Sequence, residues 1–105
     1  MTVEELLTLH DETAKTCRDI CKAKNHDYTN GSGDPFANFR TSEVVGIPLQ
    51  IGILLRMLDK MKRIQTFVEK GELMVEGESY EDACHDLINY AFLIKASLIE
   101  ENHKK

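Results

Sequence analysis

Three stretches of the chain carry apolar side chains at alternating spacings of three and four residues, and this pattern constrains the fold more than any other feature. The stretches cover residues 2–24, 48–70 and 80–101, with glycine and proline residues between them. Apolar side chains at this spacing form one face of an α-helix, and such a face must be buried against another element. The sequence therefore predicts an all-α fold, a small bundle of three main helices plus a short helical turn, in a single domain over residues 1–105.

Residues at the ends of these stretches predict the helix boundaries. Thr2 is a suitable N-cap for the first helix. Pro48 suits the first turn of the second helix, and Gly71 is a natural residue to end it. Ser79 and Asp82 resemble a capping box at the start of the third helix. The three helices are thus expected to begin and end close to these residues.

The spacing also predicts which side chains each helix buries. The first helix is expected to bury Val3, Leu6, Leu7, Ala14, Cys17, Ile20 and Cys21. The second is expected to bury Ile51, Leu54, Leu55, Leu58, Met61, Ile64, Phe67 and Val68. The third is expected to bury Ala83, Leu87, Tyr90, Ala91, Ile94 and Leu98.

Residues 25–40 lack this periodicity and contain two glycines and a proline, so a long loop is predicted there. Thr41 or Ser42 is expected to cap a brief helical turn after it. A loop of this length in a compact domain is uncommon, and its aromatic residues argue against simple disorder. Such a loop is more often functional than a mere connection.

Two interpretations of this loop are open. In the first, Phe36 and Phe39 plug the end of the bundle while Asp34 caps a turn. In the second, the loop recognises the base and ribose of a nucleotide by stacking and hydrogen bonding, and a cation meets the phosphate. The second interpretation assigns nucleotide binding to Lys24, Asn25, Asp27, Tyr28, Phe36, Asn38, Phe39 and Arg40.

The third helix carries an acidic stripe, because Glu78, Asp82, Asp86 and Asn89 recur at spacings of four, four and three. Carboxylates one helical turn apart repel each other and require a compensating cation. One interpretation is a Mg²⁺ site on Asp82 and Asp86, with Glu78 assisting in catalysis and Asn89 contacting the nucleotide. The other is that Asp82 caps the helix and Asp86 pairs with a basic residue of the neighbouring helix.

The second helix carries a basic edge formed by Arg56, Lys60 and Arg63, with Asp59 beside them. Such an edge is commonly a solvated surface, on which Asp59 pairs with Arg63. Facing the acidic stripe, it would instead hold the phosphates of a nucleotide. Asp59 is then the third candidate metal ligand.

Composition excludes several classes of function. The chain has 18 acidic and 13 basic residues, a formal charge of -5, and so lacks the basic surface that a nucleic-acid polymer requires. The N-terminal residues do not resemble a signal peptide, and no apolar run is long enough to span a bilayer, so a cytoplasmic protein is expected. Cys17, Cys21 and Cys84 lack paired spacing, which predicts reduced thiols.

Four segments together, "KNHDY", "DPFANF", "RMLDKMKRI" and "ESYEDACHDLINY", resemble small phage and bacterial proteins associated with nucleotide modification. This family is similar to the MazG-like all-α NTP pyrophosphatases. The resemblance implies a helical fold completed by homo-oligomerisation, and a site where carboxylates on two helices hold Mg²⁺ against a nucleoside triphosphate. The superfamily's usual motifs are EExxE and ExxD. Here Asp82 and Asp86 have the spacing DxxxD, and Asp59 is the only carboxylate where the first motif is expected.

Three hypotheses of function follow. The first is a nucleotide-binding protein that acts as a Mg²⁺-dependent nucleoside triphosphate pyrophosphohydrolase. The second is a noncatalytic phage protein that sequesters a linear or cyclic signalling nucleotide of host defence. The third is a helical interaction protein without a small ligand, in which the acidic stripe and basic edge are interhelical salt bridges. A small nucleotide, rather than a polymer or a membrane, is the expected partner.

Overall fold

The protein is all-α, as the sequence predicts. The computed structural model describes residues 1–29, 33–73 and 79–104, apart from the side chains of residues 27–29. In chain order the elements are the α-helix α1 (Val3–Thr29), the 3₁₀-helix η1 (Ala37–Val45) and the α-helices α2 (Leu49–Lys70) and α3 (Tyr80–His103). The described ranges contain no strand. The expected architecture of three main helices and one short helical element is confirmed.

Helix α1 begins where the sequence predicts and ends later. The backbone N–H of Glu5 donates to Thr2 Oγ1 at 3.1 Å, and the N–H of Thr2 donates to Glu5 Oε1 at 3.3 Å, so Thr2 is the N-cap. The predicted end at Lys24 is wrong, because α1 continues to Thr29. The apolar pattern stops at residue 24, but residues 25–29 include no glycine or proline that would break the backbone.

The predicted loop over residues 25–40 is wrong at both ends, because residues 25–29 belong to α1 and residues 37–40 belong to η1. Asp34 Oδ1 accepts the backbone N–H of Phe36 at 3.0 Å, which confirms that Asp34 caps a turn. Phe36 is buried at 4% exposure, as the bundle-plug interpretation requires. Thr41 and Ser42 do not cap this element, because η1 has already begun at Ala37.

Helix α2 has the predicted ends and a different buried face. Pro48 precedes it, and Gly71, with φ of 78°, donates its N–H to the Phe67 carbonyl oxygen and ends it. Its buried side chains are Leu49 and Ile53, and most of the predicted face is exposed. Side chains of that face with 44% exposure or more are Ile51, Leu54, Leu55, Leu58, Met61 and Val68.

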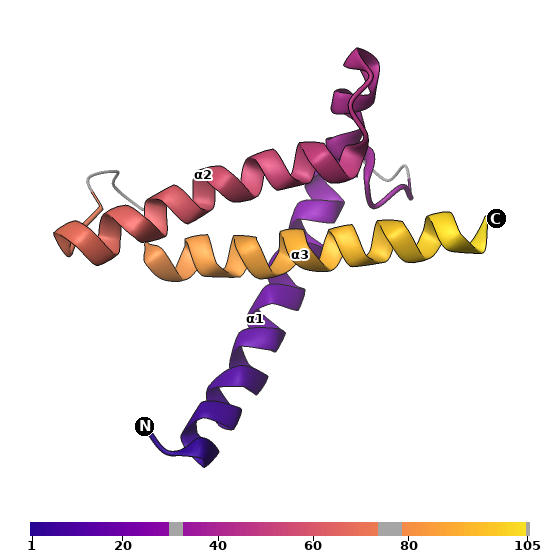
Figure 1. Cartoon of the computed structure of the whole chain (residues 1–105). Helices are drawn as coiled ribbons and strands as arrows, with labels where there is room; N and C mark the ends of the chain where they lie inside the picture. The colour runs from indigo at the N-terminus through magenta and orange to yellow at the C-terminus, as the bar shows by residue number, and fades with distance from the viewer. Residues whose placement is uncertain (30–32, 74–78, 105) are drawn as a thin grey trace.

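This difference arises because α2 is apolar on two faces and only the face toward α3 is covered. Among the described residues α1 contacts α3 and η1 but not α2. Figure 1 shows α2 and α3 running side by side while α1 crosses α3 steeply. The second apolar face of α2 consequently has no covering element within the described part of the chain.

Helix α3 begins with the predicted capping box, since the Asp82 N–H donates to Ser79 Oγ at 3.1 Å and the Ser79 N–H donates to Asp82 Oδ2 at 3.3 Å. Of its predicted buried residues, Ala83 is buried, whereas Ala91 and Leu98 are exposed. The central core consists of Phe36, Leu49 and Ile53, against which these side chains pack: Phe39, Met57, Tyr90, Leu93, Ile94 and Ala96.

No single helix in the described ranges combines the length and apolar character needed to cross a membrane. The elements η1 and α2 pass that test of length and composition only as a pair, and they are bent by 107° relative to each other.

Candidate functional site

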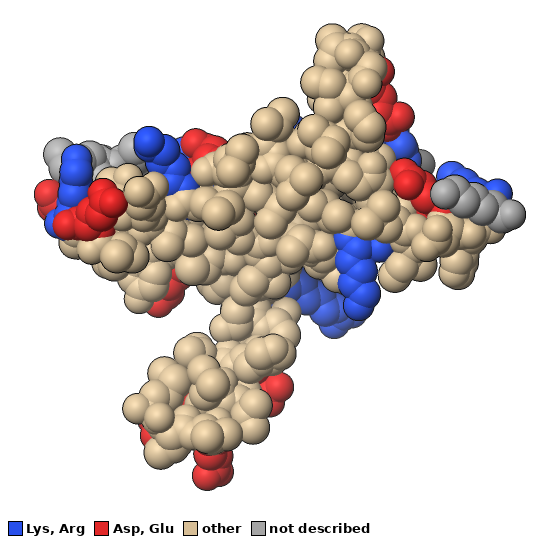
Figure 2. Space-filling model, viewed as in Figure 1, with Lys and Arg blue, Asp and Glu red and all other residues tan. Residues whose placement is uncertain are grey.

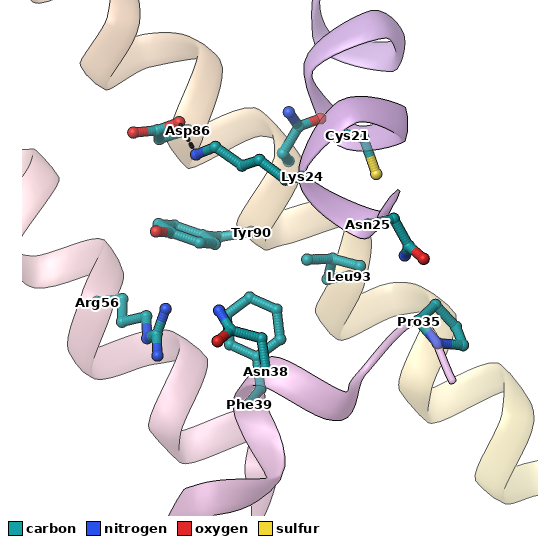
Figure 3. A pocket seen from close by; sticks show the side chains of 11 residues that line it. Cys21, Lys24, Asn25, Pro35, Asn38, Phe39, Arg56, Asp86, Tyr90 and Leu93 are labelled. Carbon is teal, nitrogen blue, oxygen red and sulfur yellow. Dashed lines mark hydrogen bonds and ion pairs between the residues drawn. The ribbon is translucent and has the colours of Figure 1, made fainter. Parts of the chain in front are cut away.

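The candidate site is a pocket where the C-terminal half of α1, the start of η1, α2 and α3 come together (Figure 3). Its cavity volume is about 80 Å³. It is lined by Cys21, Lys24, Asn25, Pro35, Asn38, Phe39, Arg56, Asp86, Asn89, Tyr90 and Leu93. Residues predicted from three separate segments, namely the loop region, the basic edge and the acidic stripe, therefore share one pocket.

The apolar wall of the pocket is an aromatic pair. The rings of Phe39 and Tyr90 meet edge to face, with centroids 6.1 Å apart and planes at 90°. Both rings are partly buried and pack against the core cluster. Their positions are thus fixed by packing, which gives the pocket a rigid floor for a planar ligand.

Arg56 lies at one edge of the pocket, on the wall contributed by α2 (Figure 3). Its guanidinium carbon is 4.8 Å from the centroid of the Phe39 ring, a cation–π contact. Arg56 forms no ion pair within the described part of the chain. The ring therefore orients the guanidinium while leaving its N–H groups available to an anion.

Asp86 is shared by two lysines from different helices. Lys24 Nζ of α1 and Lys60 Nζ of α2 each lie 3.1 Å from a carboxylate oxygen of Asp86, whose side chain is 15% exposed. Burial of the Asp86 carboxyl raises its pKa, but the hydrogen bonds from Lys60 and Lys24 outweigh this effect and hold the pKa below its usual range. The three side chains tie all three long helices together and carry a net positive charge.

Two amides complete the polar lining. The Asn89 side-chain N–H₂ donates to the Cys17 carbonyl oxygen at 3.1 Å, which fixes the orientation of its amide. The Asn38 amide makes no side-chain hydrogen bond to any described residue. Asn38 thus presents both a donor and an acceptor to a ligand in the pocket.

Several predicted binding residues lie elsewhere. Phe36 is buried in the core and has no face free for stacking. Arg40 pairs with Asp34 at 2.6 Å and with Glu43 at 3.0 Å, so it fixes the turn before η1. Arg63 pairs with Asp59 along α2. Lys60 reaches the site only through Asp86. The side chains of Asp27 and Tyr28, and the whole of Glu78, lie outside the described residues.

The three candidate metal ligands do not come together. Asp82 accepts the N–H of Ser79 as part of the capping box, Asp86 holds two lysines, and Asp59 pairs with Arg63. The described residues contain no group of three or more histidine, cysteine or acidic side chains arranged to hold a metal ion. These carboxylates fit Mg²⁺ poorly, because each is already engaged by the protein's own donors.

Sequence reasoning missed four lining residues, which are Cys21, Pro35, Tyr90 and Leu93. Tyr90 was expected only in the core, yet it lies four residues after Asp86, on the same face of α3. Leu93 follows Asn89 by the same interval. The positions four residues after predicted polar residues on the same helix could therefore have been predicted to line the pocket.

Asp34 and Asp86 should make the stability of the fold depend on pH. The pKa values of Asp34 and Asp86 are both lowered in the folded state, that of Asp34 by hydrogen bonds from Arg40 and from the Phe36 backbone. A lowered carboxyl pKa contributes stability that is present above its unfolded value of about 4 and is lost as the pH falls through the folded value. Thermal unfolding between pH 7 and pH 2.5 should show this loss below about pH 4.

The double variant Asp34→Asn/Asp86→Asn is the control for this prediction. It should be less stable than the wild type at pH 7 and should lose less stability on acidification. Equal slopes of melting temperature against pH for the two proteins would contradict the assignment.

The pocket thus combines an aromatic floor, one guanidinium without an ion-pair partner among the described residues, the Lys24–Asp86 ion pair and the amides of Asn38 and Asn89. Its polar residues come from all three long helices and η1, so it exists only in the folded chain. The chain was compared with protein-family models, with curated proteins and with solved structures, and none of these comparisons finds a match.

Proposed function

We propose that this pocket binds a nucleotide. The observation that supports the proposal is the convergence of a rigid aromatic pair, the guanidinium of Arg56 and the Lys24–Asp86–Lys60 cluster around one cavity. Aromatic rings and amides recognise a base, and guanidinium and ammonium groups recognise phosphate.

The size of the cavity indicates which part of a nucleotide it can enclose. At about 80 Å³ it is much smaller than the roughly 300 Å³ typical of sites that enclose a whole small ligand. In the proposed complex one ring enters between Tyr90 and Asn38, and the phosphates remain at the rim beside Arg56 and Lys24. Figure 3 shows these two cations on different sides of the opening, from α2 and α1.

Sequestration without hydrolysis is the form of this function that the geometry favours. Asp86 is engaged by two ammonium groups and Asp82 by a helix cap, so neither carboxylate is presented for metal binding. A protein of this kind would hold a linear or cyclic nucleotide unchanged, in keeping with the noncatalytic phage hypothesis.

A second candidate is the Mg²⁺-dependent pyrophosphohydrolase that the MazG-like resemblance implies. In its favour, Asp82 and Asp86 lie one turn apart on α3, and Asp86 lines the pocket. It requires Asp86 to exchange its lysines for a metal ion. Release of pyrophosphate from any nucleoside triphosphate in the presence of Mg²⁺ would select this candidate over sequestration.

The test is a thermal-shift screen of linear and cyclic nucleotides, followed by isothermal titration and mass spectrometry of the recovered ligand. Replacing Arg56 by glutamine should weaken binding of the best ligand about tenfold or more, because a charged hydrogen bond contributes about 1.5–3 kcal/mol. Lys62→Gln is the matched control, since Lys62 is an exposed cation on the same helix that does not line the pocket.

The outcomes separate the hypotheses. Recovery of an unchanged nucleotide whose affinity falls in Arg56→Gln but not in Lys62→Gln supports the proposal. If no nucleotide shifts the melting temperature, the proposal fails, and the ion pairs of α2 and α3 are those of a helical interaction protein.

A further inference from the structure

The chain exposes much more surface than a folded monomer of its size. Its accessible surface is 7970 Å², whereas a 12.0 kDa monomer is expected to expose about 6,000 Å². Its radius of gyration is 15.7 Å, against about 13 Å for a compact domain of this length. The excess surface is larger than the roughly 800 Å² that each partner buries in a standard protein interface.

The N-terminal half of α1 accounts for a prominent part of this excess. Figure 1 shows it projecting away from the α2–α3 pair, and Figure 2 shows the same projection in space-filling form. Every residue from Val3 to Glu12 is exposed. Val3 is 74% exposed and Leu7 is 59% exposed. These two belong to a row at alternating spacings of four and three residues, formed by Val3, Leu7, His10, Ala14, Cys17 and Cys21.

The same row docks on α3 further along the helix. Cys17 is buried at 4% exposure, with its thiol 3.9 Å from the His85 carbonyl oxygen. The exposed apolar row is therefore the direct continuation of an existing interface, past the edge of the element that covers it. A row of this kind favours a second helix as its partner.

The charges of α1 show how that second helix is oriented. Residues 3–14 contain four acidic residues and no lysine or arginine, whereas residues 15–26 contain four lysines or arginines and one aspartate. Glu4, Asp11 and Arg18 recur every seven residues and so lie along one edge of the helix. Two copies of α1 placed antiparallel set each acidic half beside a basic half, and this arrangement is self-complementary.

A groove beside the basic half of α1 is available to receive the helix. It lies between α1 and α3, with a cavity volume of about 710 Å³. Two apolar side chains of α3 in its lining are unusually open, Ile88 at 46% and Phe92 at 55% exposure. The α1 side chains that line it are Ala14, Cys17, Arg18, Cys21, Lys22, Asn25 and His26.

We propose that this groove is occupied by the N-terminal half of α1 from a second copy of the chain, in a two-fold dimer with antiparallel α1 helices. Leu7 of each copy then packs near Ile88 and Phe92 of the other, and Asp11 of each copy lies beside Arg18 of the other. The groove shares Cys21, Asn25 and Asn89 with the nucleotide pocket, so the second copy also covers one side of that pocket. The dimer itself does not depend on the proposed ligand.

The first experiment measures molar mass by light scattering during gel filtration. The wild type should elute as a dimer, with twice the 12.0 kDa mass of one chain. Leu7→Glu should be monomeric with unchanged helical circular dichroism, because it places a charge in the apolar interface. Val44→Glu, at an even more exposed apolar residue on η1, should remain dimeric. A monomeric wild type at 100 μM would overturn the proposal.

The second experiment tests the antiparallel arrangement by exchanging charges. Variant A, Glu4→Lys/Asp11→Lys, makes the acidic half basic, and variant B, Arg18→Glu/Lys22→Glu, makes the basic half acidic. Each alone sets like charges together, so its dimer dissociation constant should rise at least tenfold. A mixture of A and B should form a 1:1 heterodimer, because every acidic half again meets a basic half.

The control for variant A is Glu69→Lys/Glu100→Lys, which changes the net charge equally at exposed positions of α2 and α3. It should dimerise like the wild type. Dimers of A or of B as tight as the wild type, or a mixture that forms no heterodimer, would refute the antiparallel pairing. Loss of the dimer in Leu58→Glu but not in Leu7→Glu would show that the chain dimerises through the exposed apolar face of α2 instead.

Discussion

Replacing Ile53 with alanine should lower the free energy of unfolding by about 2–5 kcal/mol. Ile53 is fully buried at 0% exposure and packs with Phe36 and Leu49 at the centre of the core. Removing its methyl groups leaves a cavity where α2, α3 and the segment before η1 meet. Urea denaturation at one fixed protein concentration measures the change, since dimerisation would make stability concentration-dependent.

Two variants set the scale for this result. Ile53→Val should cost only about 0.5–1.5 kcal/mol, because it removes one methyl group from the same site. Ile51→Ala, two residues away on the exposed side of α2, should change stability by much less than Ile53→Ala. Equal losses for Ile51→Ala and Ile53→Ala would show that the described core is not the one that stabilises the protein.

Replacing Asp86 with asparagine should destabilise the protein and strengthen nucleotide binding. The variant removes the carboxylate that holds Lys24 and Lys60, and its stability should fall by about 1–3 kcal/mol. It also removes a negative charge beside the proposed phosphate position, the carboxylate that Lys24 and Lys60 share. The affinity for an anionic ligand should therefore rise by up to about tenfold, as titration calorimetry would measure.

Asp82→Asn is the matched control, a neutral amide one helical turn away. It weakens the capping box and should cost about 1 kcal/mol or less, with nucleotide affinity unchanged. The metal-dependent alternative predicts the reverse for both positions, since loss of either carboxylate would weaken Mg²⁺-dependent binding. Weaker binding by Asp86→Asn would thus exclude the proposed role of its lysines.

The sequence predicts helix boundaries well wherever a local hydrogen bond decides them. Thr2, Gly71 and Ser79 act on backbone groups within four residues. Thr2 and Ser79 mark the start of a helix and Gly71 marks the end of one, as expected. The buried face of α2 is different, because it depends on which helices lie alongside. The periodicity identified apolar positions correctly, but it does not show that α1 leaves the side formed by Ile51, Leu54 and Leu58 uncovered.

In the candidate site, too, local contacts are predictable from the sequence, whereas contacts between distant segments are not. Lys24, Asn38 and Arg56 reach the pocket because their segments converge in the fold, and their residue types alone made them candidates. Arg40 was an equally good candidate by type, but Asp34 lies six residues before it and binds it locally. Whether a nearby acid actually pairs with a cation, as Asp34 does with Arg40 and Asp59 does not with Arg56, is decided by the fold.

The attachment of α1 to α3 also has a consequence for synthesis of the chain. The hydrogen bond from Asn89 to the Cys17 carbonyl joins residues 72 positions apart. At translation rates of about 5–20 residues per second, α1 leaves the ribosome roughly 4–14 s before the surface on which it docks. During this interval its apolar row is open to any nearby helix, including α1 of another nascent chain on the same messenger RNA.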